Sequence, residues 1–326
     1  MGARGDLRLV MIGAGWIVPY HLAALDRLAR TTLVGVAALR LERAAAVAEP
    51  RGAVASDDPV ALVDEVRPDV AFVCVPPWRA VGIGEALVER GVPFLTEKPL
   101  AATDADGPVR LAAAIERAGL VVAVGYHLRA LEGLDDLRGR LAAEPPRLVT
   151  GRWLDATPAA PWWRHVETGG GQVVEQATHL YDLGRVLVGE ASVVGATSVR
   201  GGASGPEDGD VADATAALLR YEMGALGTFL NSRRSAAATV DLELVGDAGS
   251  GRIARREGPA GWEISFVDGA SRRSLPLGRD PYEIQDERFL DAVVAGDPSR
   301  VLATYADALR TDRLTRAVVA ATGQPG

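Results

Sequence analysis

The chain has 326 residues, of which 48% are hydrophobic, so it is long enough for two domains that each bury a core. A net charge of −8, without a basic face, argues against nucleic acid as a partner. The apolar runs are too short to span a membrane, and the first residues lack a signal-peptide pattern, which favours a cytoplasmic location.

The cysteine and histidine content bounds the chemistry further. The single cysteine, Cys74, lies in the apolar run VAFVCV and is expected to be a buried core thiol. The four histidines, at positions 21, 127, 165 and 179, lack the spacing of a zinc site. We therefore expect no bound metal, and a small molecule rather than a macromolecule as the partner.

Short apolar runs alternate with amphipathic segments over the first part of the chain. Strands are expected over residues 7–13, 33–39, 69–75, 92–97 and 120–126, and helices over 20–29, 43–49, 82–91 and 111–119. This alternation is typical of a doubly wound parallel sheet. We predict an α/β dinucleotide-binding domain of the Rossmann type over residues 1–125.

Longer amphipathic strands follow from about residue 147. They are expected over residues 147–156, 215–232, 239–247 and 262–269, with one helix near 172–188. Segments 282–296 and 304–322 have apolar residues at three- and four-residue spacing and should be helical. We predict an α+β domain with a mostly antiparallel sheet over residues 126–326, and a mobile loop over 201–210.

The run LRLVMIGAGWIVPYHLAAL places Gly13 and Gly15 between a buried strand and a helix, the setting of a dinucleotide-binding turn. Gly13 would permit the tight turn, and Gly15 the close approach of a pyrophosphate to the amides of Trp16 and Ile17. Val18 replaces the third glycine of the pattern, which predicts a slightly displaced helix. The alternative for a GxG run by itself is an ordinary turn.

The second expected strand ends without the acid that usually binds the adenosine ribose, because position 38 is Ala. Arg40 and Arg43 follow, and a guanidinium favours a 2′-phosphate, so NADP is slightly favoured over NAD. The alternative is that both arginines only solvate the start of a helix.

The segment FLTEKPLA places Glu97 and Lys98 at the carboxyl end of a strand, where ligands of open α/β sheets bind. A lysine at this position can donate a hydrogen bond to a substrate oxygen close to a nicotinamide. The alternative is a surface charge beside the turn that Pro99 fixes.

On the helix expected near 172–188, Glu175, His179 and Asp182 are spaced i, i+4 and i+7 and would form one stripe. A buried carboxylate beside an imidazole can orient the ring and stabilise its protonated form, which gives a general acid–base group. The alternative is a solvated helix face with an ordinary ion pair.

Taken together, GAGWIV, TEKPLA and GGGQVVEQATHLYD resemble the Gfo/Idh/MocA family, the relatives of glucose-fructose oxidoreductase and inositol dehydrogenase. The resemblance continues through GYHLR, ELVGDAGSG and PYEIQDERFLDAVVAGDPS, so it covers nearly the whole chain. It implies a Rossmann domain, then a domain with a large open sheet that is often used for dimer or tetramer contacts. The implied reaction interconverts an alcohol and a ketone on a sugar or cyclitol.

The resemblance implies that Lys98 and His179 are catalytic, with Glu175 standing where the family usually has Asp. Trp163 and Arg164 match a Trp-Arg pair near the nicotinamide. The alternative is that the aromatic pair Trp162 and Trp163, beside Pro161, only anchors a loop. The expected cofactor contacts are Gly13, Gly15, Trp16, Ile17, Arg40, Pro76, Glu97, Lys98, Trp163 and Arg164. The expected substrate contacts are Lys98, Arg129, Trp162, Glu175, His179 and Asp182.

Three functional classes stay open: a dehydrogenase or ketosugar reductase, an NAD-dependent glycoside hydrolase on the same fold, and a sugar-sensing relative without activity. The presence of Lys98 and His179 argues against the third class. Apolar residues on both faces of the strand region 215–230 also favour a homodimer or homotetramer through the open sheet.

Overall fold

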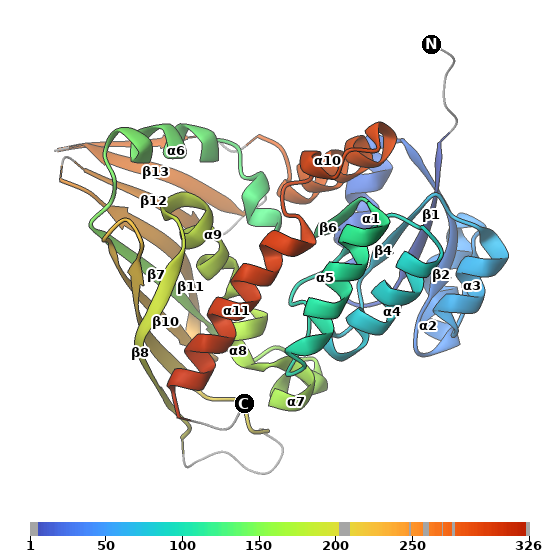
Figure 1. Cartoon of the computed structure of the whole chain (residues 1–326), viewed down its shortest axis with the longest axis horizontal. Helices are drawn as coiled ribbons and strands as arrows, with labels where there is room; N and C mark the ends of the chain where they lie inside the picture. Colours follow the sequence, from blue (N-terminus) through green and yellow to red (C-terminus); the bar gives the residue numbers. More distant parts are fainter. Residues whose placement is uncertain are drawn as a thin grey trace. The chain divides into compact units, whose positions relative to one another are not determined.

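The computed structural model describes residues 6–201, 209–247, 249–256, 261–268, 270–275 and 278–323. The chain divides into two compact units (Figure 1). Unit 1 comprises Met1–His127 with Asp280–Leu309, and unit 2 comprises Leu128–Arg279 with Arg310–Gly326. Most of the loop expected over 201–210 lies outside the described residues. No helix in the described ranges is long and apolar enough to cross a membrane.

Unit 1 is built on a parallel sheet with the strand order β3-β2-β1-β4-β5-β6. Its strands are β1 (Leu7–Ile12), β2 (Thr31–Ala37), β3 (Val54–Ser56), β4 (Val70–Val73), β5 (Phe94–Thr96) and β6 (Val122–Val124). Its helices are α1 (Val18–Leu28), α2 (Leu41–Ala48), α3 (Pro59–Val66), α4 (Pro77–Glu89), α5 (Asp106–Ala118), α10 (Pro281–Ala295) and the first residues of α11 (Tyr305–Ala321). This strand order is that of the doubly wound dinucleotide-binding fold, which confirms the predicted Rossmann domain.

Helix α10 belongs to unit 1 because of the core that it joins. Phe289 and Leu290 of α10 are fully buried in the same cluster as Leu9 of β1 and Phe72 of β4. The predicted second domain over residues 126–326 therefore needs correction for Asp280–Leu309, which belong to unit 1. Apolar periodicity identifies a helix but not the core against which it packs.

Unit 2 contains a mixed sheet with the order β14-β13-β12-β11-β7-β10-β9-β8, in which β7 and β10 are parallel and the other paired neighbours are antiparallel. Its strands are β7 (Leu148–Ala156), β8 (Ala191–Val199), β9 (Ala214–Tyr221), β10 (Leu226–Ser232), β11 (Arg234–Val245), β12 (Gly249–Arg255), β13 (Trp262–Asp268) and β14 (Ser271–Leu275). Its helices are α6 (Leu134–Ala143), α7 (Val166–Gly169), α8 (Gly171–Glu175), α9 (Thr178–Val188) and the rest of α11. The mostly antiparallel sheet agrees with the prediction.

The structure corrects two predicted elements of unit 2. The helix expected near 172–188 is two helices, because α8 ends at Glu175 and α9 begins only at Thr178. The strand region expected over 215–232 is a hairpin of β9 and β10, closed by a hydrogen bond from the Tyr221 amide to the Ala225 carbonyl. In both cases the apolar pattern continues across the break, so periodicity did not reveal it.

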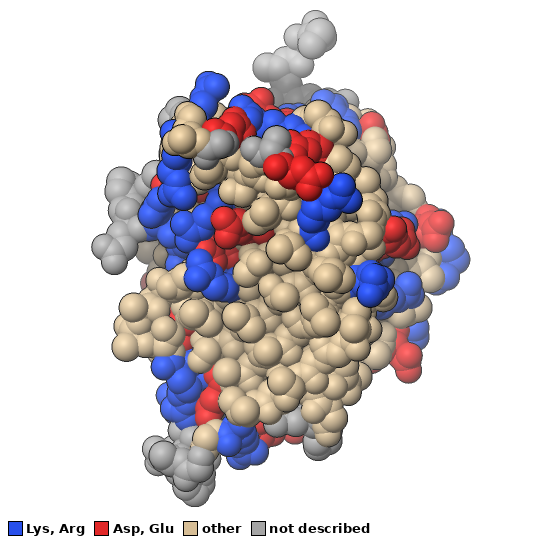
Figure 2. Space-filling model, turned by 90° about the vertical axis from the view of Figure 1, so that its left-hand side faces the viewer, with Lys and Arg blue, Asp and Glu red and all other residues tan. Residues whose placement is uncertain are grey.

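The two faces of the unit 2 sheet differ in their cover. One face packs on α9, and its core includes Trp153 of β7 and Leu183 of α9. The opposite face exposes apolar side chains, with Leu148 48%, Leu226 37% and Leu230 43% exposed. Figure 2 shows a broad area without charged residues on this side, bordered by arginine and acidic side chains. This surface of β7, β8, β9 and β10 is called the open face below.

Candidate active site

The turn between β1 and α1 has two glycines with different physical roles. Gly13 has a φ of +126°, and a Cβ atom on it would lie 2.1 Å from the carbonyl oxygen of Cys74. The Gly13 amide also donates to the Ala37 carbonyl at 2.7 Å. Gly13 is therefore required by the fold, since only glycine fits between the neighbouring strands in this conformation.

Gly15 is not constrained by its own protein, because a Cβ atom on it would meet nothing within 4 Å. Beyond it, Trp16 is 69% exposed and Ile17 precedes α1 without a side-chain cap. The backbone thus leaves open space at the positive end of an eleven-residue helix, where a pyrophosphate can approach the amides. Val18 begins α1 and is buried in the core of unit 1.

The ends of β2 and β4 supply further candidate cofactor contacts. After β2, Leu39 is 75% exposed and Arg40 is an exposed residue immediately before α2. After β4, the partly buried Pro76 precedes α4, and Cys74 is buried as expected. These positions lie after the carboxyl ends of parallel strands, where dinucleotides bind in this fold.

Glu97 and Lys98 follow β5, as the sequence predicted. The Glu97 amide donates to the Val73 carbonyl at 2.9 Å, so the segment is fixed to the end of β4. A Cβ atom on Gly125 would lie 2.4 Å from Oε1 of Glu97, so that glycine makes room for the carboxylate. Lys98 is partly buried and is the single lysine among 35 lysine and arginine residues.

In unit 2, His179 lies on α9 and is 3% exposed. Its ring stacks on the indole of Trp153, with centroids 5.8 Å apart and planes at 18°. Among the described residues, Nε1 of Trp153 is buried without a hydrogen-bond partner, and Arg255 lies over the same indole at 6.0 Å. Trp153 was missed by the sequence analysis. Its signal was the alternation of β7, in which Val149, Gly151 and Trp153 face the covered side.

Glu175, at the end of α8, is held by an aromatic residue. Nε1 of Trp163 donates to Oε2 of Glu175 at 2.6 Å, and Trp163 is 1% exposed. The same segment, Pro161–Arg164, is anchored by the Thr168 hydroxyl, which donates to the Trp162 carbonyl at 2.6 Å. These contacts support the alternative that Trp163 anchors this loop.

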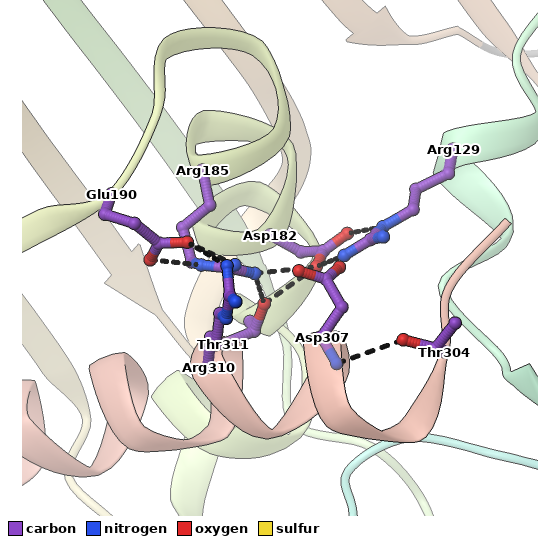
Figure 3. Close-up of polar contacts among 8 residues, drawn as sticks. All are labelled: Arg129, Asp182, Arg185, Glu190, Thr304, Asp307, Arg310 and Thr311. Atoms are coloured by element: carbon purple, nitrogen blue, oxygen red, sulfur yellow. Dashed lines mark hydrogen bonds and ion pairs between the residues drawn. The ribbon is translucent and has the colours of Figure 1, made fainter. Parts of the chain in front are cut away.

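Asp182 is part of a buried ion-pair network (Figure 3). Arg129 donates from Nε and Nη2 to the two carboxylate oxygens at 2.7 and 2.5 Å, and Thr311 donates to Oδ1 at 2.7 Å. Arg185 donates to Thr311 and, through two nitrogens, to Glu190. The side chains of Arg129 and Asp182 are only 6% and 1% exposed.

The predicted stripe is therefore not uniform. The helix is interrupted between Glu175 and His179, and the three side chains have different surroundings: Trp163 for Glu175, Trp153 for His179 and Arg129 for Asp182. The network gives Asp182 and Arg129 a structural role, and their contact with substrate stays a prediction.

Comparisons with known proteins agree with this division. Residues 7–126 match the oxidoreductase family with an NAD-binding Rossmann fold, and residues 145–252 match the GFO/IDH/MocA C-terminal domain. The chain is 26% identical over 309 residues to the myo-inositol 2-dehydrogenase of Thermotoga maritima, and the match covers 90% of each chain.

Two solved structures share the fold. A 3-ketoreductase from Actinomadura kijaniata, in complex with NADP and TDP-benzene, has a TM-score of 0.85 at 20% identity, covering 97% of this chain and 98% of that one. A levoglucosan dehydrogenase in complex with NADH and levoglucosan has a TM-score of 0.83 at 22% identity, covering 98% and 97%. The motif resemblance, both family matches and the shared fold lead to one conclusion: the chain belongs to the Gfo/Idh/MocA family of oxidoreductases, whose N-terminal domain binds NAD(P).

Proposed function

We propose that this protein is an NAD(P)-dependent dehydrogenase or reductase that interconverts a secondary alcohol and a ketone on a sugar, sugar derivative or cyclitol. The observation that carries the proposal is that each unit holds one side chain suited to this chemistry. Lys98, the single lysine, follows β5 of the dinucleotide-binding unit, and His179 is a buried imidazole stacked on Trp153. Relatives named for inositol and levoglucosan support a polyhydroxylated substrate.

In the direction of oxidation, His179 accepts the proton of the reacting hydroxyl, and Lys98 donates a hydrogen bond to the same oxygen. Bound NAD(P)⁺ supplies the hydride acceptor for the carbinol carbon. Loss of the proton and of the hydride leaves the carbon–oxygen double bond, and the reverse sequence reduces a ketone. A positioned base contributes about 10²- to 10⁴-fold to such a step. Glu175, fixed by Trp163, supports the positive charge that His179 gains.

The dinucleotide would lie over Gly15, with its pyrophosphate at the amides of Trp16 and Ile17. The open space at Gly15 and the uncapped start of α1 support this assignment. Arg40, exposed before α2 and without an acid at position 38, would bind a 2′-phosphate, which favours NADP.

We also propose that two or four copies associate through the open face. Leu148 lies directly opposite Leu226 in the pairing of β7 with β10, and Leu230 lies on the same face of β10 beyond Thr228, so exposed apolar side chains recur along this strip. A second copy of this chain would cover that strip with an equivalent one, as in an isologous contact. Sedimentation at micromolar concentration should detect a dimer or tetramer, and a single 34.2 kDa species would contradict the proposal.

The activity is tested with a panel of sugars, cyclitols and their keto forms, followed by the absorbance of reduced nicotinamide. We expect net formation or consumption of NAD(P)H with at least one pair. Lys98→Ala and His179→Ala should each lower kcat about a hundredfold or more, with dinucleotide affinity retained. Lys98→Arg is the matched control for charge, because it retains the positive charge but replaces the ammonium with a guanidinium of different shape. Cleavage of a glycoside without net change in NAD(P)H would identify the hydrolase instead.

A further inference from the structure

A buried histidine in unit 1 lies between two carboxylates that the proposed chemistry does not use. His21, on α1, has a fully buried side chain. Its Nδ1 lies 3.1 and 3.0 Å from the two oxygens of Asp286, and its Nε2 lies 3.1 Å from Oε1 of Glu97. Asp286 is itself fully buried on α10, and the Glu97 side chain is only 10% exposed.

The proton count of this triad follows from hydrogen-bond chemistry. An ionised carboxylate only accepts hydrogen bonds, and a neutral imidazole donates from one nitrogen. Both carboxylates are satisfied in ionised form only when both ring nitrogens carry hydrogen, and in that state His21 is an imidazolium. With both nitrogens acting as donors, the ring has no lone pair left for a metal.

The electrostatic surroundings of His21 and Glu97 agree with this assignment. Burial disfavours the charged ring, but the charge and hydrogen bond of Asp286, with a contribution from Cys74, outweigh it and raise the pKa of His21 well above its usual value. Burial also acts on Glu97, yet His21 and Lys98 hold the pKa of that carboxyl below its usual range. Burial raises the pKa of Asp286 in spite of the His21 charge.

The triad joins three segments that are far apart in the sequence. His21 belongs to the helix that begins at the dinucleotide turn, and Asp286 belongs to a helix more than 250 residues later. Glu97 directly precedes Lys98 and is confined by Gly125 on one side and by its amide bond to Val73 on another. Lys98 therefore directly follows a residue whose main chain and side chain are both held in place.

We propose that His21 is a positioning residue for Lys98: as an imidazolium held by Asp286, it fixes Glu97 and so fixes the ammonium that follows. This role rests on the proposed function of Lys98. A shift of about 1 Å in such a group can cost up to 10²-fold in rate, so the triad matters for turnover although it does not touch substrate.

The test uses the fact that Lys98 is the single lysine. Protein grown with ¹³C-labelled lysine gives one set of ε-methylene signals, and these report Lys98 without assignment. In the wild-type protein we expect two resolved ε-proton resonances, because a fixed side chain places the two protons in different surroundings. Collapse to one averaged resonance would indicate a free side chain.

Two matched variants separate positioning from packing. In His21→Gln the amide nitrogen stands near the Nε2 position and can still donate to Glu97, whereas in His21→Asn it stands near Nδ1 and can donate only to Asp286. We expect His21→Gln to retain the resolved pair and His21→Asn to lose it. Leu22→Ala on the same helix removes core packing but not the triad, and it should retain the pair. Equal spectra for the Gln and Asn variants would overturn the positioning role.

Two further measurements complete the test. ¹⁵N-labelled histidine should show two protonated ring nitrogens for His21 at neutral pH, and a single ring N–H would overturn the imidazolium assignment. Once a substrate is known, kcat should fall about tenfold to a hundredfold in His21→Asn, with dinucleotide affinity unchanged. If no turnover is found for any substrate, the proposed function fails, while the spectra of Lys98 still decide the role of His21.

Discussion

The indole nitrogen of Trp163 donates a 2.6 Å hydrogen bond to Oε2 of Glu175, twelve residues later in the chain. Trp163 is 1% exposed, so the carboxylate is oriented by a rigid, buried donor. Glu175 stands where the family resemblance implies an Asp. The indole thus sets the direction of this longer side chain, because it fixes one of the two carboxylate oxygens.

Trp163→Phe should expose the function of this bond. It keeps an aromatic side chain but removes the indole donor and part of a buried ring, so we expect a loss of at least about 1.5–3 kcal/mol in the free energy of unfolding, measured with urea. It should also lower kcat, whereas Trp162→Phe, which leaves the bond intact, should change neither quantity to the same degree. Glu175→Gln should have a smaller effect on kcat than His179→Ala. An unchanged unfolding free energy in Trp163→Phe would contradict the assigned role.

The two glycines of the dinucleotide turn should respond to mutation in opposite ways. Gly13→Ala forces a Cβ to 2.1 Å from the Cys74 carbonyl oxygen at positive φ, so it should cost about 2–4 kcal/mol of stability. The Cβ atom of Gly15→Asp meets no protein atom within 4 Å, so the substitution should leave the melting temperature nearly unchanged while its charge repels the pyrophosphate. Calorimetric titration with NAD(P)H checks the second part, and unchanged affinity in Gly15→Asp would show that the dinucleotide lies elsewhere.

Local patterns predicted most of the Rossmann unit, but not β3 (Val54–Ser56), α3 (Pro59–Val66) or the membership of α10. Each strand of a sheet covered on both faces is a short apolar run, and the glycines follow the first strand directly. The same patterns predicted the positions of Lys98 and His179. What they could not supply was pairing between distant segments: nothing local connects His21 with Asp286, or Arg129 with Asp182.

The break between α8 and α9 was missed for a different reason. The apolar positions Val173, Val174, Ala177 and Leu180 continue through it at helical spacing, and all four are buried. The Gln172 carbonyl accepts hydrogen bonds from the amides of both Gln176 and Ala177, so the regular helical hydrogen-bond pattern is interrupted while the apolar side chains stay in the core. Burial alone therefore carried no sign of the interruption.

The Asp182 network predicts a stability phenotype. Asp182→Asn leaves the buried Arg129 guanidinium without its ionised partner, so the free energy of unfolding should fall by about 3–5 kcal/mol. Thr311→Val removes one hydrogen bond to the same carboxylate and the hydrogen bond that Thr311 accepts from Arg185, so it should cost about 1–3 kcal/mol. Unfolding in urea measures both. A raised KM in Asp182→Asn without a loss of stability would instead assign Asp182 to the substrate.

Cofactor preference should depend on Arg40. If its guanidinium binds a 2′-phosphate, Arg40→Ala should weaken NADP binding about tenfold to a hundredfold and leave NAD binding unchanged. Arg43→Ala, an exposed arginine three residues later, is the matched control for charge. Affinities are compared by titration at constant salt, because phosphate contacts weaken with ionic strength. Equal losses of affinity for both cofactors, or no loss, would show that Arg40 does not bind the 2′-phosphate.

His127 should make the protein sensitive to mild acid. Burial is the main cause that lowers the pKa of His127 to about 4, and the charges of Lys98 and His21 act in the same direction against the attraction of Glu97. In the unfolded chain the pKa is about 6.5, so below that pH the unfolded state takes up a proton that the folded state refuses. Stability is therefore fully present above pH 6.5 and falls by up to about 1.4 kcal/mol per pH unit until the pH reaches about 4.

Because carboxylates titrate in the same range, the comparison is with His127→Phe, which retains the stacking on Tyr282 at 4.4 Å. Urea unfolding at pH 7, 6, 5 and about 4 should show a steeper loss in the wild-type protein than in His127→Phe, since only the wild-type protein has this histidine. Parallel slopes for the two proteins would mean that His127 is protonated equally in the folded and unfolded states.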